Sequence, residues 1–266
     1  MNRGIITKMR IDYDRPVQYT FVVSDNFIPL NAYLNKTICL KWIGKVQCCC
    51  GKQLSEFYRQ NFCYQCFWNA PQASPSIFKP ELCTADLGIE ERDLDWEQEF
   101  QIAPHYIYLA NSSGLKVGIT RKTQKMTRWM DQGASQAILL AEVPNRRLSG
   151  LIELELKKIL SDKTNWRKML SGVPLALDLK KEKEKYLSTV PADLHQYIID
   201  NDEVTEITYP VITYPLKIPN KNSLSFQKDH VVEGKLLGIK GQYLILDNDR
   251  VFNVRRHEGY IIDFLF

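Results

Sequence analysis

Long apolar runs, an export signal and several common catalytic signatures are all missing from this 266-residue sequence. No stretch of about 18 apolar residues occurs, so no segment is expected to cross a bilayer as a helix. The opening MNRGIITKMRIDYD lacks the apolar centre of an export signal. We therefore expect a soluble, cytoplasmic protein with no membrane partner.

Two familiar kinds of enzyme are also disfavoured. The sequence has no phosphate-binding glycine loop and no G-x-S-x-G elbow.

Its four histidines are scattered, and no two of them have the spacing of metal ligands: His105, His195, His230 and His257. We assign these histidines no role.

Cysteines are present but do not suit a disulfide scaffold. The number is odd, seven, and all of them lie between Cys39 and Cys83. Secreted disulfide scaffolds are usually shorter and have evenly paired cysteines. Clustered cysteines without an export signal instead favour metal binding in a reducing compartment.

One cysteine segment has the spacing of a zinc knuckle. Three adjacent cysteines precede Gly51, and a C-x-x-C pair follows after a gap of twelve residues. Four thiolates in tetrahedral geometry select zinc and leave no open position for water, which predicts a structural zinc ion. The first ligand pair is open among Cys48, Cys49 and Cys50. We favour the set Cys48, Cys50, Cys63 and Cys66. The alternative is a group of buried or incidental thiols.

The two remaining cysteines are less easily placed. Cys83 stands alone and could belong to a second, incomplete site. Cys39 lies in a strand-like run and is better explained as core.

Positive charge is concentrated in the middle of the chain. Between Gln101 and Leu170 there are 12 basic and 5 acidic residues, a net charge of +7, whereas the whole chain carries only +4. A local excess of this kind suits a polyanion such as nucleic acid. A solvated lysine-rich surface is the alternative.

The hydrophobic pattern divides the chain into five segments and predicts an α+β fold. Residues 1–47 and 207–266 are rich in strand signals, and the two ends could pack into one small barrel. Residues 48–102 contain the knuckle and an irregular linker, and residues 171–206 form a helical connector. Residues 103–170 predict the order β-β-α-β-α, with Met126, Trp129 and Met130 on one helix face.

Several stretches resemble a bacterial family known as domain of unknown function 2797. They are PHYIYLANSSGLKVGIT, TRWMDQGASQA, LSGLIELELKKILSDKTNWRKML, the C-G and C-x-x-C cysteines, PELC at 80–83 and GIKGQYLI at 238–245. The resemblance covers most of the chain. Members often have a further cysteine before PELC and a histidine after it, where this sequence has Ser76 and Asp86. That departure puts a second metal site in doubt.

The central segment is also similar to a divergent GIY-YIG nuclease domain over about seventy residues. Tyr106-Ile107-Tyr108 stands where the first motif would be. Lys116-Val117-Gly118 stands at the second, with lysine in place of its tyrosine. The remaining matches are single residues on the predicted helices and after them: Arg128, Glu153 in the form E-x-x-L-K, and Asn165.

This similarity implies a phosphodiester-cleaving site built from Tyr108, Arg128, Glu153, Tyr106, Lys116 and Asn165. Glu153 would hold Mg or Mn, which polarises the phosphoryl oxygen. Tyr108 would activate water, Arg128 would bind phosphate bidentately and Lys116 would add a point charge.

Each of these residues also has a simpler interpretation. The two tyrosines could be ordinary strand formers, and Arg128 could belong to the polar face of its helix. Glu153 could pair with Lys157 on the helix surface, while Glu155 competes for the metal role. Asn165 could cap a turn.

Three functions therefore remain open. The first is a metal-dependent nuclease acting on DNA or RNA. The second is a non-catalytic nucleic-acid-binding module, which the lysine in the second motif favours. The third is a protein-interaction scaffold stabilised by zinc. The nuclease hypothesis requires Tyr108, Arg128 and Glu153 to converge on one concave, positively lined surface.

Overall fold

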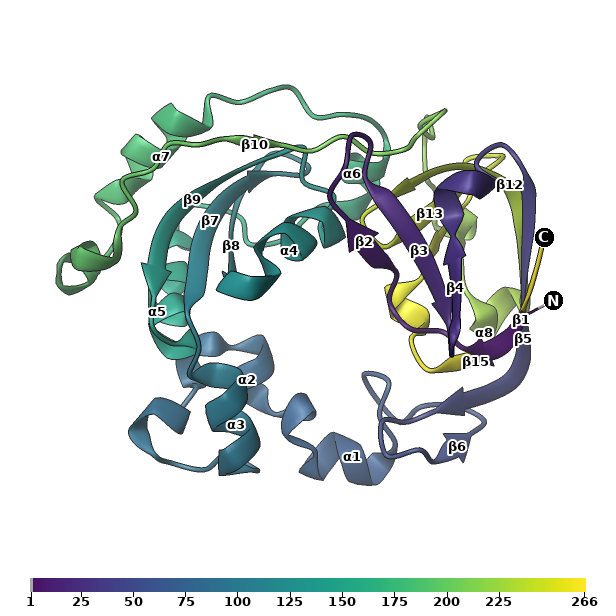
Figure 1. Cartoon of the computed structure of the whole chain (residues 1–266), viewed down its shortest axis with the longest axis horizontal. Coiled ribbons are helices and arrows are strands. Elements are labelled where there is room, and N and C mark those ends of the chain that lie inside the picture. Colours follow the sequence, from purple (N-terminus) through teal and green to yellow (C-terminus); the bar gives the residue numbers. More distant parts are fainter. Residues whose placement is uncertain (1) are drawn as a thin grey trace.

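The computed structural model describes residues 2–266 and shows an α+β protein with three sheets (Figure 1). The largest sheet combines both ends of the chain, because β1 pairs with β15 and β15 pairs with β5. Its strand order is β1 (Asn2–Ile5), β15 (Tyr260–Leu265), β5 (Thr37–Gln47), β12 (Val231–Lys240), β13 (Tyr243–Leu246), β14 (Val251–Asn253) and β11 (Ser223–Leu224), with β6 (Gln53–Leu54) also on β5.

The expected small barrel does not form within residues 2–266. The two β-rich ends do join in one sheet, but its strand order is an open path from β1 to β11. After β1 the chain turns toward the second sheet, where the Ser24 backbone N–H donates to the Ile5 carbonyl at 2.9 Å. That sheet is antiparallel and comprises β2 (Arg10–Asp12), β3 (Gln18–Val23) and β4 (Asn26–Pro29).

The third sheet belongs to the central segment and has the element order that the sequence predicts. Its strands are β10 (Thr205–Glu206), β9 (Gln136–Val143), β7 (His105–Asn111) and β8 (Leu115–Arg121), with β8 at the edge. Alternation along β7 sends Tyr108 toward α4 (Lys125–Asp131) and sends Ile107 and Leu109 toward the opposite face. On that face lie α5 (Arg146–Leu156) and α7 (Leu179–Leu187) (Figure 1).

The linker between knuckle and sheet is more helical than the sequence suggested. Its acidic stretch, expected to be irregular, contains α3 (Leu94–Gln101). The Asp93 side chain accepts a hydrogen bond from the Trp96 backbone N–H at 3.1 Å, so an acidic residue begins the helix by capping it. Further short helices are α1 (Tyr64–Asn69), α2 (Pro75–Phe78), and the 3-10 turns Pro71–Ala73, Pro80–Leu82 and Ala85–Leu87.

The remaining helices are short. They are α6 (Trp166–Leu170), α8 (Phe226–Asp229), and the 3-10 turns Leu30–Tyr33, Lys122–Gln124, Ala192–Tyr197, Asn220–Asn222 and Arg255–His257. Among residues 2–266, no helix combines the length and apolar character needed to cross a membrane.

The inner face of the central segment shares one hydrophobic core with the two ends of the chain. Trp129 and Tyr108 belong to the same buried cluster as Phe21 and Phe264. The Tyr209 hydroxyl donates to the Ala134 carbonyl at 2.8 Å, and a Cβ at Gly241 would lie 2.9 Å from the Asp131 carbonyl oxygen. This close packing fixes α4 against the carboxyl-terminal strands, which matters for the site below.

Candidate functional site

The cysteine knuckle brings four thiols together. The Sγ atoms of Cys48, Cys50, Cys63 and Cys66 all lie within 4.8 Å of one another. The Cys50 and Cys63 sulfurs are 3.9 Å apart. Zinc–sulfur bonds of about 2.3 Å in a tetrahedron place sulfurs about 3.8 Å apart, so the arrangement fits a zinc ion. Cys49 is exposed and lies outside this group, although the sequence left it open as a ligand.

Local structure explains why these four thiols meet. Cys48 follows β5, and Gly51 adopts a left-handed φ of 84° that returns the chain to β6. Cys63 caps α1, with its sulfur accepting a hydrogen bond from the Cys66 backbone N–H at 3.4 Å. The C-x-x-C spacing therefore places two sulfurs at one helix end, facing the turn that carries the other two.

Hydrogen bonds to sulfur prepare the knuckle for a cation. Burial opposes charge on the Cys48 thiol, but hydrogen bonds from the backbone N–H groups of Cys63 and Cys50 outweigh it and lower its pKa to about 6. Burial and hydrogen bonds with the neighbouring thiols raise the pKa of Cys66. A metal ion would deprotonate the remaining thiols, because thiolates are its ligands.

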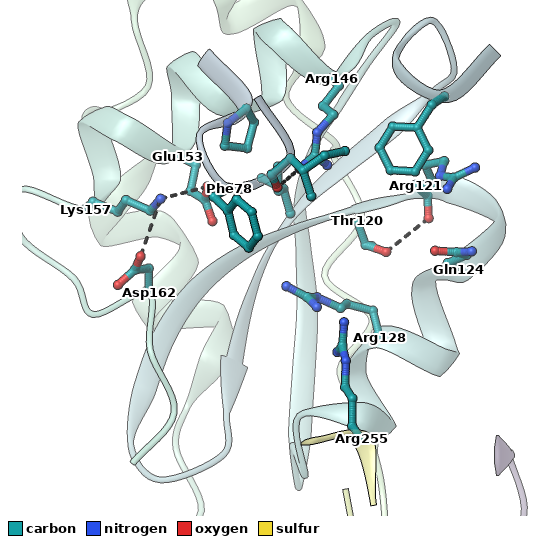
Figure 2. Close-up of a pocket in the computed structure, with 14 residues that line it drawn as sticks. Phe78, Thr120, Arg121, Gln124, Arg128, Arg146, Glu153, Lys157, Asp162 and Arg255 are labelled. Atoms are coloured by element: carbon teal, nitrogen blue, oxygen red, sulfur yellow. Dashed lines mark hydrogen bonds and ion pairs between the residues drawn. The ribbon is translucent and has the colours of Figure 1, made fainter. Parts of the chain in front are cut away.

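A second feature is a cavity of about 390 Å³ beside the edge strand β8, which we call the arginine cavity (Figure 2). It is bounded by α2, α3, α4, α5 and the Arg255–His257 turn. Its charged lining residues are Arg121, Arg128, Arg146, Glu153, Lys157, Asp162 and Arg255. Five positive charges thus face two negative ones.

The four arginines of the cavity have no carboxylate partner within residues 2–266. The Nε atoms of Arg128 and Arg146 are buried, and neither has a hydrogen-bond partner in the described chain. Figure 2 shows the side chains of Arg128 and Arg255 converging from α4 and from the carboxyl-terminal turn. The cavity lining thus carries an excess of positive over negative charge, and this excess points to an anionic ligand.

Glu153 is the buried carboxylate of the cavity, with its side chain 9% exposed. Its Oε2 atom lies 3.0 Å from Lys157 Nζ, and the same ammonium lies 3.4 Å from Asp162 Oδ2. Burial alone would lower the pKa of Lys157, but the hydrogen bond and charge of Glu153 outweigh it and raise that pKa. The ion pair expected as the simpler interpretation is therefore present, although it lies at the cavity rather than on an open surface.

Tyr108 is buried and does not line this cavity, so of the three residues whose convergence the nuclease hypothesis requires, only Arg128 and Glu153 meet there. Its hydroxyl is fully buried and donates to Gln132 Oε1 at 2.8 Å, and Lys116 Nζ donates to the same oxygen at 3.1 Å. A Cβ at Gly118 would lie 2.5 Å from the Tyr108 hydroxyl, which explains the glycine of the second motif. Burial raises the pKa of Tyr108, so this phenol is a poor base for activating water here.

Lys116 belongs to the same buried group. Burial and the nearby Arg128 charge lower its pKa to about 8. A lysine with such a pKa is partly uncharged near neutral pH and can exchange a proton.

Two of the six predicted catalytic residues lie elsewhere. Burial and the charge of Glu142 raise the pKa of Tyr106. Lys122 Nζ lies 5.7 Å from the centre of the Tyr106 ring. The Tyr106 side chain therefore faces Glu142 and Lys122 rather than the cavity. Asn165 caps α6, where its side chain accepts from the Lys168 backbone N–H at 3.1 Å. The turn-capping interpretation of Asn165 is the one that the structure supports.

Three cavity arginines were missed by sequence reasoning. Arg121 and Arg146 were counted in the basic segment but given no role, and Arg255 lies more than a hundred residues away. Arg146 follows Asn145, the residue that caps α5, so a helix-start signal could have drawn attention to it. No local pattern marks Arg255.

The region of Ser76, Cys83 and Asp86, where the family could have a second metal site, holds no cluster of possible metal ligands in the described residues 2–266. Cys83 is buried, and its sulfur lies 3.9 Å from the Ser76 carbonyl oxygen. Asp86 instead forms an ion pair with Arg147, with Oδ2 and Nη2 2.7 Å apart. Cys39 lies in β5 and is half-buried.

Comparison with known proteins gives one match. The family model described as "Protein of unknown function (DUF2797)" matches residues 35–262. No curated protein and no solved structure matches the chain. The similarity to GIY-YIG nucleases therefore stays a prediction. Since the match spans most of the sequence, the chain belongs to the DUF2797 family, as its PELC and GIKGQYLI stretches predicted.

Proposed function

We propose that the protein is a nucleic-acid-acting zinc protein, in which the arginine cavity holds a phosphate of the strand. One observation carries this proposal: four arginines without carboxylate partners line a single cavity. Guanidinium groups bind phosphate bidentately, and a strand offers a regular series of phosphates. A zinc ion held by the four thiols of the cysteine knuckle would have no open position for water and would be structural.

The chemical step in this proposal is divalent-metal-dependent hydrolysis of the phosphodiester bond. Glu153 and Asp162 offer the carboxylate oxygens that Mg or Mn prefers, at the positions where Lys157 now bridges them. The ion would stabilise charge on the phosphoryl and leaving oxygens. Arg128 orients the phosphate, while Tyr108 and Lys116 hold Gln132 beneath the cavity. The resemblance to a GIY-YIG domain supports the same assignment.

A non-catalytic DNA- or RNA-binding role is the second candidate, and a specific observation favours it. The Lys157 ammonium already neutralises Glu153, so a metal ion would have to displace it. The phenol expected to activate water is also buried. A cavity with these properties would hold phosphate without cutting it.

Cleavage assays separate the two candidates. The zinc-loaded full chain is incubated with single- and double-stranded DNA and RNA in the presence of Mg or Mn. The nuclease proposal expects cleavage that Glu153→Gln abolishes, whereas Glu155→Gln cuts like the parent because Glu155 pairs with Lys158 outside the cavity. Binding without cleavage of any substrate leaves the second candidate. Absence of binding even at low salt removes both.

A further inference from the structure

The cysteine knuckle carries a group of aromatic rings that lie outside the hydrophobic core. Tyr58 is 43%, Tyr64 62% and Trp68 51% exposed. Their rings are contiguous: Tyr58 and Tyr64 centroids are 5.0 Å apart, and Phe67 and Trp68 centroids are 5.1 Å apart. We call these four residues the aromatic platform. Exposed aromatic clusters of this kind usually mark a binding surface.

The platform is attached to the cysteine cluster rather than to a hydrophobic core. Three of its residues lie on α1, which has no buried residue. The same helix carries Cys66 and is capped by Cys63. A bound zinc ion would fix the helix and its rings, so these side chains would lose little further conformational entropy when a ligand binds them. Rigid aromatic rings make favourable contact surfaces for that reason.

The charge around the platform favours an anionic partner. Lys52 and Glu56 line a hollow together with Tyr58 and Tyr64, and Arg92 donates from Nη1 to the Phe67 carbonyl at 3.1 Å. The Arg59 guanidinium lies over two platform rings, 5.5 Å from the Tyr58 centroid and 5.8 Å from the Phe67 centroid. Flat apolar rings within a basic surface match a ligand that combines flat apolar groups with negative charge.

We propose that the aromatic platform stacks unpaired bases of a single-stranded nucleic acid. Every base has a flat face that can stack on an aromatic ring, and the accompanying phosphates meet the basic surroundings. Bases in a duplex are already stacked on one another, so their faces cannot reach these rings. The inference rests on the proposed nucleic-acid function and specifies its substrate class as a strand with unpaired bases. An apolar protein partner is the competing outcome of the test.

Fluorescence anisotropy tests this proposal on the zinc-loaded full chain in buffer free of magnesium and chelators. The probes are labelled oligothymidine and a blunt duplex of equal length. Tyr64→Ala and Trp68→Ala are each expected to weaken oligothymidine binding about tenfold, with the salt dependence and the duplex affinity unchanged. Tyr64→Phe retains a ring and should bind like the parent. Zinc content, measured for every variant, shows that the knuckle remains loaded.

Phe27→Ala is the matched control. Phe27 is 51% exposed, as Trp68 is, and Arg10 lies over its ring at 4.3 Å, but it belongs to β4 in another sheet. Its removal should leave oligothymidine binding unchanged. Parent-like binding by both Tyr64→Ala and Trp68→Ala, or equal loss for single strand and duplex, overturns the platform. Stable capture of a protein with no oligothymidine binding overturns it as well.

Cavity variants distinguish this proposal from the proposed function. If Arg128→Ala and Arg255→Ala weaken binding but the platform variants do not, the proposal of a phosphate site in the cavity stands and the proposal of base stacking on the platform is wrong. If only the platform variants weaken binding, base stacking on the platform stands and the cavity is not a strand-binding site.

Discussion

The cysteine knuckle and the arginine cavity are built in opposite ways. All four thiols of the knuckle lie between Cys48 and Cys66, on one turn and one helix start. The cavity draws its lining residues from Ile77 to Arg255, across four helices, a strand edge and a carboxyl-terminal turn. A local site can be recognised from spacing alone, whereas an assembled site depends on how distant segments pack.

The two regions also differ in what stabilises them. The knuckle has little hydrophobic core of its own, because α1 has no buried residue, so a metal ion bound by its four thiols would supply much of its order. One wall of the cavity, α4, packs on the shared hydrophobic core through Trp129 and Met130. Its four arginines have no carboxylate partner in the described chain, an arrangement typical of groups retained for binding.

The largest expected effect follows from breaking the knuckle. Cys63→Ser should abolish stoichiometric zinc binding, since tetrathiolate sites contribute about 10–16 kcal/mol in zinc-finger peptides. Amide exchange in residues 48–70 should then become fast, while β7 and β8 stay protected. Metal analysis and hydrogen exchange measure both. Cys49→Ser is the control and should retain zinc; its loss of zinc would show that Cys49 is a ligand.

A smaller effect is expected at Lys240 in β12, which does not line the arginine cavity. Lys240 is buried, and its ammonium donates to the Met169 and Gly172 carbonyls at 2.9 and 3.0 Å. Burial lowers its pKa from 10.5 to about 8. Between these values the unfolded chain holds a proton that the folded chain has lost, so the free energy of unfolding rises with pH. This contribution amounts to about 3 kcal/mol at most.

Lys240→Met should lack that rise. Denaturant unfolding below pH 8 and near pH 10.5 measures it, with the parent gaining stability relative to the variant across this window. Lys235→Met, at an exposed position of the same strand, should follow the parent. Parallel curves for Lys240→Met and the parent would contradict the assignment.

Substitution of a single cavity arginine tests whether segments that lie far apart in the sequence form one binding site. Arg128→Ala and Arg255→Ala should each weaken strand binding by about 1.5–3 kcal/mol and lower its salt dependence by about one phosphate contact. Filter binding over a salt series gives both quantities. Arg256→Ala is the control, since Arg256 is exposed and does not line the cavity. An equal effect of Arg256→Ala would indicate general surface attraction instead.

The smallest effect is expected at the position where relatives often have a histidine. Asp86 accepts hydrogen bonds from two nitrogens of Arg147, and the Asp86 and Arg147 side chains are only 13% and 29% exposed. Asp86→Asn should therefore lower the free energy of unfolding by about 1 kcal/mol, because the amide retains one acceptor, and leave zinc content unchanged. Loss of zinc from this variant would mean that a second metal site exists after all.

Local sequence patterns predicted several features correctly. The β-β-α-β-α order of the central segment follows from the alternation and helical periodicity of its apolar residues. The acidic stretch containing α3 was assigned wrongly, because Asp93 and the following residues cap a helix instead of preventing one. The prediction of a small barrel was wrong, because the chain after β1 continues into a separate sheet and the largest sheet stays open.

The sequence by itself located the knuckle, because thiolate chemistry and short spacing mark it, but it left the first ligand pair open among Cys48, Cys49 and Cys50 until the structure grouped Cys48 and Cys50 with Cys63 and Cys66. It also named Arg128 and Glu153, which the structure places at one cavity. Only the tertiary structure decided that Tyr108 lies buried beneath that cavity, that Asn165 caps a helix and that Arg255 completes the lining. The physical reason is that burial and convergence depend on long-range packing, which no local spacing encodes.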